Sequence, residues 1–233
     1  MQNREILLWG IGLATPFFLV FGALSDKVGR KWIMLTGMLL GVIFYRPIFS
    51  TMLTAADAKE WAKGDVVFLK EESKVVQHGK DSVIQIATQY KAANGSKFTR
   101  LVTDTLKNNS QASIIKANER AVYQDKILSP SLKWKFIGLV WVMIIFVTMV
   151  YGPVAAFLVE LFPTKIRYTS MSLPYHIGNG VFGGLVPFIA TLLSATYTQD
   201  PLVGLWYPII IAAVCFVIGA LYLRNKIDEQ VDD

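Results

Sequence analysis

A few charged and polar residues interrupt otherwise apolar segments of this chain, and their types suit ion pairing and the handling of protons or anions. Asp26 and Glu160 are carboxylates beside basic residues in two short polar stretches. His176 and Asn179 are three apart, which puts them on one face of an α-helix. Arg46 lies within an apolar run. Such groups are costly in an apolar environment, so they usually face a partner or a water-filled cavity.

The elements that must position these residues are long apolar segments. Of the 233 residues, 53% are hydrophobic, and the mean hydropathy of +0.43 is high for a soluble domain. Five stretches of 19 to 24 residues are almost free of charge, and about 20 helical residues cross a hydrocarbon core. The sequence therefore predicts an all-α transmembrane fold in a lipid bilayer, with five membrane-spanning helices at 6–24, 32–53, 136–159, 171–193 and 203–223.

The composition argues against several other classes of protein. Cys215, the only cysteine, lies inside a span, which excludes a disulfide-stabilised secreted domain. The first span is too long, and too rich in large residues up to its end, for a signal peptide. The net charge is +6, but the basic residues of 54–133 are dispersed among acidic and polar ones, as on a solvated surface. We expect no nucleic-acid partner, no cofactor and no metal.

The spans and the charged residues divide the chain into three parts. Residues 1–53 hold two spans and a short loop, residues 54–133 form a polar insert, and residues 134–233 hold three spans and a tail. Within the insert, patches at 66–69 and 82–86 alternate as strands do, and we expect a helical stretch around 98–106. The insert is therefore expected to be a small α/β or mixed fold.

Basic residues in the short loops predict the orientation, because such residues favour the cytoplasmic side. The turn at 194–202 has none. The other short connections and the tail carry Lys27, Arg30, Lys31, Lys165, Arg167, Arg224 and Lys226. We expect a multi-pass protein of the cell inner membrane, with the N-terminus and the insert outside and the C-terminus in the cytoplasm.

Glycines and prolines within the spans indicate close packing and bending of helices. Gly37 and Gly41 are four apart, as are Gly180 and Gly184, and such small-residue pairs let helices approach closely in lipid. Prolines at 16, 47, 153, 174, 187 and 208 also fall within spans, where each tends to bend its helix. These features suit a bundle that opens and closes around a cavity. A static, glycine-packed bundle is the alternative.

An ordered motif connects the first two spans. It consists of Gly22, Asp26, Lys27, Gly29, Arg30 and Lys31 in the order G-x-x-x-D-K-x-G-R-K. Gly22 predicts a helix contact, Gly29 a tight turn, and Asp26 an acceptor for the start of the next helix. The order resembles the signature loop of the major facilitator superfamily, which implies that Asp26 acts in a conformational latch. A plain basic turn at the membrane surface is the alternative.

The connection after the third span strengthens this resemblance. It reads Glu160-Leu-Phe-Pro-Thr-Lys-Ile-Arg167, which is similar to the family's E-x-F-P-T-x-x-R connection between helices ten and eleven. Pro163 predicts the end of a helix, and Glu160 and Arg167 are near enough to pair with each other or with the neighbouring loop. A membrane-edge salt bridge of little energetic value is the alternative to a gating role.

The fourth span points to one branch of the family. Residues 172–184, S-L-P-Y-H-I-G-N-G-V-F-G-G, resemble helix eleven of the metabolite:proton symporters, the group with proline/betaine, α-ketoglutarate, citrate and shikimate carriers. The resemblance implies a partial major facilitator fold, helices eight to twelve, with helices one to seven missing. The insert at 54–133, between helices nine and ten, departs from the family's compact pattern.

Three residues are candidates for a substrate or proton pathway. His176 lies nine residues beyond Arg167, about 13 Å along a helix and well inside the bilayer. For His176 and Asn179, an interhelical hydrogen bond and a solute or proton role remain open. Arg46 lies about 22 Å beyond Lys31, in the outer third of the bilayer. It is placed either to extend to the outer surface or to face the cavity, where it would suit a carboxylate substrate.

The resemblance implies a transporter and not an enzyme. We expect alternating-access transport of a small organic solute, with proton-coupled symport of an organic acid or zwitterion taken from the resemblance alone. The expected partners are the bilayer, the solute, protons and a missing N-terminal half. The alternatives are a membrane-anchored binding or sensor protein that displays the 54–133 insert, and a truncated, non-functional product.

Overall fold

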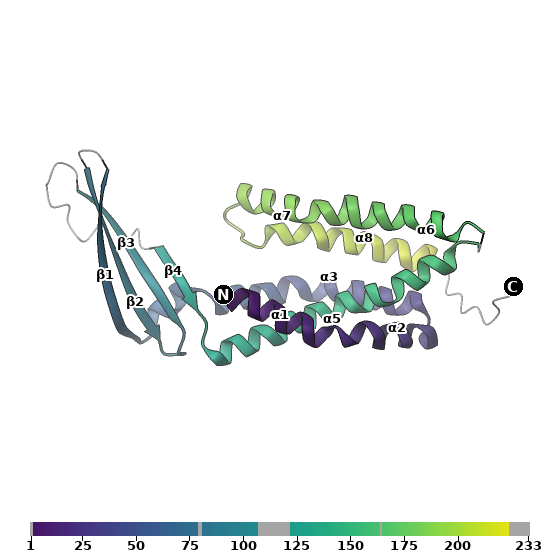
Figure 1. Ribbon diagram of the computed structural model, residues 1–233, viewed down its shortest axis with the longest axis horizontal. Helices are drawn as coiled ribbons and strands as arrows, with labels where there is room; N and C mark the ends of the chain where they lie inside the picture. The colour runs from purple at the N-terminus through teal and green to yellow at the C-terminus, as the bar shows by residue number, and fades with distance from the viewer. Residues whose placement is uncertain (1, 79–80, 107–121, 164, 224–233) are drawn as a thin grey trace. The chain divides into compact units, whose positions relative to one another are not determined.

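The computed structural model describes residues 2–78, 81–106, 122–163 and 165–223. The chain divides into two compact units, one of Met1–Gln2 and Met52–Phe136 and the other of Asn3–Thr51 and Ile137–Asp233. The first unit holds a sheet, and the second holds most of the apolar helices (Figure 1). Thr164 of the second loop motif and the basic residues Arg224 and Lys226 of the tail lie outside the described residues.

Five helices in the described chain are long and apolar enough to cross a membrane, which confirms the five predicted spans. Four of them continue beyond the apolar stretch at both ends, because the polar residues there extend the helix past the hydrocarbon length. Their bounds are Gln2–Val28, Arg30–Lys63, Pro130–Leu161, Arg167–Thr196 and Val203–Tyr222.

The first span is made of two helical segments and ends in a tight turn. Helix α1 (Gln2–Ala14) gives way at Thr15 to α2 (Pro16–Val28), since Pro16 has no N–H to donate to the preceding turn. Gly29 follows with φ +101°, a conformation that residues with a Cβ rarely adopt. Helix α3 (Arg30–Ala55) starts directly afterwards, so the tight turn predicted at Gly29 is confirmed.

Helix α5 (Pro130–Leu161) packs against α1, α2 and α3 through glycines. A Cβ on Gly10 of α1 would lie 2.7 Å from Val140, and one on Gly37 of α3 would lie 2.8 Å from the Met149 Cβ. A Cβ on Gly152 of α5 itself would lie 3.1 Å from a backbone oxygen of α2. Close approach at these three points explains why α5 can contact three neighbours at once.

The predicted role of the other paired glycines is wrong. A Cβ on Gly41 would meet only Tyr45 of its own helix, at 3.8 Å. Gly180 and Gly184 would have nothing within 4 Å in the described structure. The reason is that none of these three glycines faces a closely approaching helix, so four-residue spacing alone does not identify a packing face.

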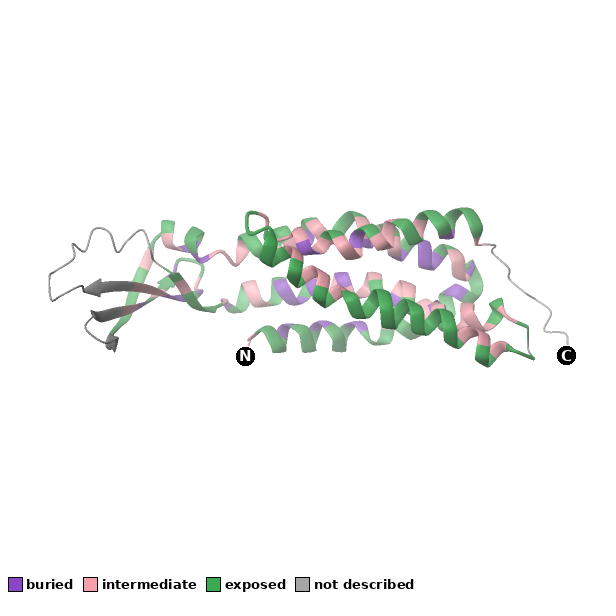
Figure 2. Ribbon diagram, turned by 90° about the horizontal axis from the view of Figure 1, so that it is seen from above, coloured by how far each residue is buried: buried purple, intermediate pink, exposed green. Residues whose placement is uncertain are grey.

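The fourth span is not a uniform α-helix. It consists of α6 (Arg167–His176), a π-helical segment η2 (Ile177–Gly183) and α7 (Gly184–Thr196). None of its residues is buried in the described structure (Figure 2). After the short 3-10 turn η3 (Val203–Leu205), helix α8 (Trp206–Tyr222) completes the set.

The first unit contains a short helix and an antiparallel sheet in the order β1-β2-β3-β4. Its core is Ala58, Trp61, Ala92 and Phe98, and Phe98 is only 1% exposed. The insert is thus a small mixed fold, in agreement with the prediction. Its elements are α4 (Ala58–Lys63), β1 (Val66–His78), β2 (Asp81–Ala92), β3 (Lys97–Leu106) and β4 (Val122–Ile127).

The strand patches at 66–69 and 82–86 lie in β1 and β2, as expected. The helix expected around 98–106 is wrong, because this segment is strand β3 and pairs with both β2 and β4. It contains three threonines, one valine and one phenylalanine, which favour a pleated surface, and the two neighbouring strands supply its backbone hydrogen bonds. Tertiary pairing therefore decided its structure.

Candidate functional site

Arg30 brings the two loop motifs together. One of its terminal nitrogens, Nη2, donates to Asp26 Oδ1 at 3.2 Å and lies 2.6 Å from Glu160 Oε1. Asp26 is in the last turn of α2, Arg30 is the first residue of α3, and Glu160 is in the last turn of α5. We call these three residues the loop cluster. Asp26 thus does accept a hydrogen bond from the start of the next helix, but from the guanidinium of its first residue.

The two ion pairs of the loop cluster differ in strength. The Asp26 side chain is 61% exposed and Glu160 is 46% exposed, whereas Arg30 is 19% exposed. The Arg30–Glu160 pair is shorter and less hydrated, so it contributes more to holding the helices together. Arg30 Nη1 is buried without a hydrogen-bond partner among the described residues. This arrangement therefore does not satisfy every donor, and a buried, unpaired N–H costs about 1–3 kcal/mol.

Lys31 links the motif to the last helix. Its ammonium group donates to the backbone oxygens of Ala220 at 2.9 Å and Leu223 at 2.7 Å, at the end of α8. A cation there pairs with carbonyl groups that have no partner within the helix. Nearby, a Cβ on Gly219 of α8 would lie 2.9 Å from Leu35 of α3. The sequence placed Lys31 at the membrane surface and did not predict this contact.

The remaining motif residues have smaller roles in the geometry. Glu160 pairs with the neighbouring loop through Arg30, and the Nε of Arg167 donates to the Phe162 oxygen at 3.4 Å. Lys27 is exposed in the last turn of α2. A Cβ on Gly22 would have nothing within 4 Å, and the contact expected there is made by Gly152, whose Cβ would lie 3.3 Å from the Gly22 nitrogen.

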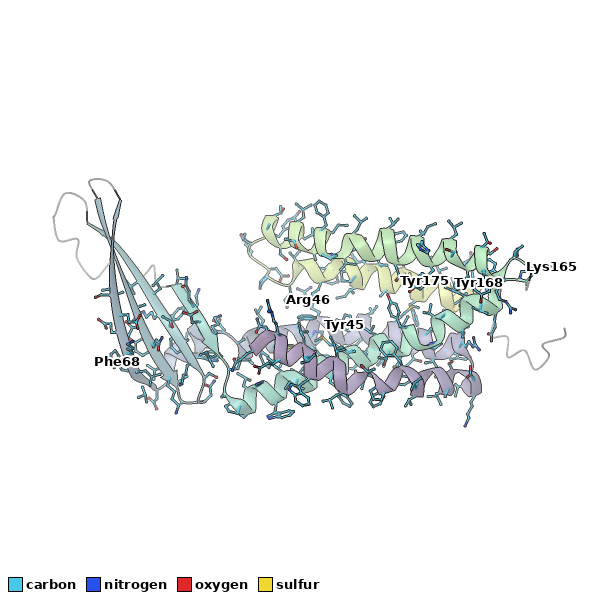
Figure 3. All side chains as sticks on the ribbon, viewed as in Figure 1. Tyr45, Arg46, Phe68, Lys165, Tyr168 and Tyr175 are labelled. Carbon is cyan, nitrogen blue, oxygen red and sulfur yellow. The ribbon has the colours of Figure 1, made fainter. Side chains whose placement is uncertain are left out.

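Arg46 is ion-paired instead of free. Its guanidinium lies 2.9 Å from Asp200 Oδ2, in the connection between α7 and η3, and 4.8 Å from the ring centroid of Trp206 at the start of α8. Figure 3 shows the Arg46 side chain extending from α3. Asp200 was missed from the sequence. Its signal was that it is the one acidic residue in the turn 194–202.

His176 and Asn179 have different surroundings. The Nδ1 of His176 is hydrogen-bonded to the backbone oxygen of Ser172 at 2.8 Å, within α6. Asn179 Oδ1 accepts a hydrogen bond of 3.0 Å from the Tyr151 hydroxyl of α5. His176 is the last residue of α6, whereas Asn179 lies in the π-helical segment η2, which begins at Ile177. Tyr151 had no signal beyond being a polar-tipped residue inside an apolar span.

Comparisons with known proteins identify three metabolite transporters as relatives. The chain is 40% identical over 82 residues to a protein of Haemophilus influenzae described as a metabolite transport protein, a match that covers 35% of this chain and 17% of the relative. It is 33% identical over 99 residues to the citrate-proton symporter of Klebsiella pneumoniae, covering 42% and 21%. It is 39% identical over 49 residues to the inner membrane metabolite transport protein YhjE of Escherichia coli, covering 21% and 11%.

These relatives confirm the resemblance to metabolite:proton symporters that the loop motifs and the fourth span indicated. The matches span about a fifth or less of each relative's length. No family model matches the chain. No solved structure matches it either.

Proposed function

We propose that this chain is the C-terminal part of a proton-coupled symporter of the major facilitator superfamily, which moves a small organic acid or zwitterion by alternating access. The observation that carries the proposal is the position of Arg30 between Asp26 and Glu160, because it joins the two loop motifs into one cluster. The similarity to a citrate-proton symporter supports the coupling ion and the class of solute. The protein performs no covalent chemistry.

The loop cluster acts as a conformational latch. Arg30 ties α3 to α2 and α5, and Lys31 ties α3 to the end of α8. Contacts of this kind bias a two-state equilibrium toward the state in which they form. A few kcal/mol are enough to change which state predominates. The unpaired Arg30 Nη1 supports the idea that the cluster rearranges in the other state.

The basic loops support a fixed orientation in the inner membrane. The N-terminus and the insert, at 54–133, lie outside, and the C-terminus lies in the cytoplasm. The loop cluster is then at the cytoplasmic surface, and the Arg46–Asp200 pair is near the outer surface. His176 and Asn179 lie along the solute or proton pathway. Residues 1–53 and 134–233 form helices eight to twelve, and the missing N-terminal half supplies the rest of a site between two halves.

Uptake into membrane vesicles tests the proposal. The transporter that carries this chain together with its preceding spans is reconstituted in liposomes with an imposed pH gradient. We expect saturable uptake of at least one of radiolabelled citrate, α-ketoglutarate and proline, and loss of uptake when a protonophore removes the gradient. The 233-residue chain alone should show no uptake, since five helices do not enclose a site between two halves. Uptake by the isolated chain, or none by the long form, contradicts the proposal.

A membrane-anchored binding protein is the second candidate. It is favoured by the insert, which belongs to a compact unit with a core around Phe98 and Trp61. The coding sequence upstream of Met1 separates the two candidates. Seven further apolar spans in frame, or in an adjacent frame, are expected for a transporter, whereas an unrelated gene or a promoter favours the anchor.

A further inference from the structure

The contact between Tyr151 and Asn179 lies deep in the apolar part of the helices. Tyr151 is nine residues before Glu160 on α5, and Asn179 is twelve residues after Arg167 on the fourth span. At 1.5 Å per residue, these separations are about 13 Å and about 18 Å. Half of a hydrocarbon core is about 15 Å, so both side chains lie near the middle of the bilayer. Solute sites of secondary transporters are found at this depth.

The hydrogen bond fixes which groups the pair presents. Asn179 Oδ1 is occupied as an acceptor for the Tyr151 hydroxyl at 3.0 Å. The amide nitrogen of Asn179, with its two N–H donors, therefore points away from Tyr151. The Asn179 side chain is exposed, and Tyr151 is 48% exposed. Two N–H donors facing hydrocarbon would be costly, so a water-filled cavity that admits an acceptor is the fitting environment.

The π-helical segment η2 is what directs Asn179 toward α5. Its seven residues, Ile177–Gly183, include three glycines, and Pro174 lies one turn earlier. A π segment inside an α-helix alters the direction of the residues it contains, and such segments are frequent at functional sites. A second tie to the same segment comes from α8, where the Tyr207 hydroxyl donates to the Phe182 oxygen at 3.4 Å. Asn179 is thus held in a defined orientation.

We propose that Tyr151 and Asn179 form a site for a carboxylate group of the transported solute, in which the Asn179 amide donates to a carboxylate oxygen and Tyr151 holds the amide in that orientation. This inference rests on the proposed transport function. It adds a positioning residue, Tyr151, and a chemical class of ligand, an anionic acceptor. Asn179 is the residue in contact with the solute.

Two substitutions test the donor arrangement by citrate uptake in the long form. Tyr151→Phe leaves the amide free to rotate, so we expect KM for citrate to rise about tenfold with kcat nearly unchanged, the loss of about one well-aligned hydrogen bond. Asn179→Asp keeps an acceptor for Tyr151 but removes both donors and adds a negative charge, and it should raise KM at least as much. Tyr197→Phe, which removes a hydroxyl from a 58% exposed tyrosine at the end of α7, is the matched control. If the Tyr151→Phe variant has the same KM as that control, the inference is overturned. Citrate uptake by the parent in the same assay would still support the transport proposal.

A labelling experiment on the same long form does not depend on transport. Cys215 and any cysteine of the preceding spans are changed to Ser, and Asn179→Cys and Val181→Cys are each introduced into that background. Val181 is 52% exposed and lies about half a turn away in η2. A charged, water-soluble thiol reagent should label Cys at 179 at least ten times faster than Cys at 181, and citrate should slow the reaction at 179. Equal, slow labelling at both positions means that 179 faces lipid, which overturns the inference whether or not the parent transports citrate.

Discussion

Removing the charge of Glu160 should change the balance between access states more than removing the charge of Asp26. Two unit charges about 4 Å apart attract by about 4 kcal/mol at an effective dielectric constant of 20. Because Glu160 is 46% exposed, hydration reduces this attraction, but Arg30 is only 19% exposed and the bond is charge-assisted, so the net contribution is about 1–2 kcal/mol. Asp26 is 61% exposed and its hydrogen bond to Arg30 is longer, at 3.2 Å, so this i,i+4 pair is worth under about 1 kcal/mol.

These energies convert into measurable ratios. A change of 1–2 kcal/mol corresponds to about a fivefold to thirtyfold change in a population ratio. Glu160→Gln keeps the shape and one acceptor oxygen, so it removes only the charge. We expect it to lower the turnover of the complete transporter by about fivefold or more, at equal surface expression, with a smaller effect on KM. Asp26→Asn should lower turnover by less than about fivefold.

The assay compares initial uptake rates of the two variants with those of the parent and of Lys165→Gln, an exposed lysine in the same loop. An Arg30→Gln variant combined with Glu160→Gln completes a double-mutant cycle. If the pair acts as a latch, the two changes together lower turnover little more than either change alone. Turnover of Glu160→Gln within about a factor of two of the parent refutes this reasoning. A larger effect from Asp26→Asn than from Glu160→Gln refutes the assignment of the stronger pair.

Three further predictions concern stability, each measured by thermal unfolding of the purified chain in detergent. Gly37→Ala should destabilise by about 1–3 kcal/mol, since its Cβ would lie 2.9 Å from a backbone oxygen of α5, whereas Gly180→Ala, with nothing within 4 Å, should be close to neutral; equal effects would contradict the packing described. Arg46→Lys keeps the charge near Asp200 but loses the planar contact with Trp206, so it should cost about 0.5–1 kcal/mol, less than Arg46→Gln, which loses both; parental stability of Arg46→Lys would show that charge alone matters. Phe98→Ala should cost about 3–5 kcal/mol in the insert unit, where Phe98 is 1% exposed, and retention of the parental melting profile by circular dichroism in the β region would contradict that core.

The number of spans and the turn at Gly29 could be predicted from the sequence, because each follows from one strong local constraint. A run of about 20 uncharged residues has few alternatives to a membrane helix. A glycine between two helices readily takes a positive φ. By contrast, segment 98–106 has no strong local preference. Its strand structure comes from pairing with β2, which ends at Ala92, and with β4, which begins at Val122. Both partners lie outside the segment, so reading the segment by itself gave the wrong answer.

The candidate site was predictable in its residue types but not in its pairings. Asp26, Arg30 and Glu160 stood out as charges at the ends of apolar runs, yet the sequence alone left open whether Glu160 meets Arg167 or the neighbouring loop. Helix packing decides this, since Gly37 and Gly152 bring α3 and α2 against α5 and so carry Arg30 to Glu160.

The same reasoning explains why Tyr151 and Asp200 were missed. Each became visible only through a partner on another element, Asn179 for Tyr151 and Arg46 for Asp200. A tyrosine or a single acid is common in such positions, so its type carries little information until the partner is known. In a bundle where most of the surface faces lipid, a hydrogen bond between polar side chains of neighbouring helices is informative about function. The distance of a residue in sequence from a motif is less informative. That is why the Tyr151–Asn179 contact, and not His176, whose hydrogen bond stays within α6, is the better starting point for mapping the solute pathway.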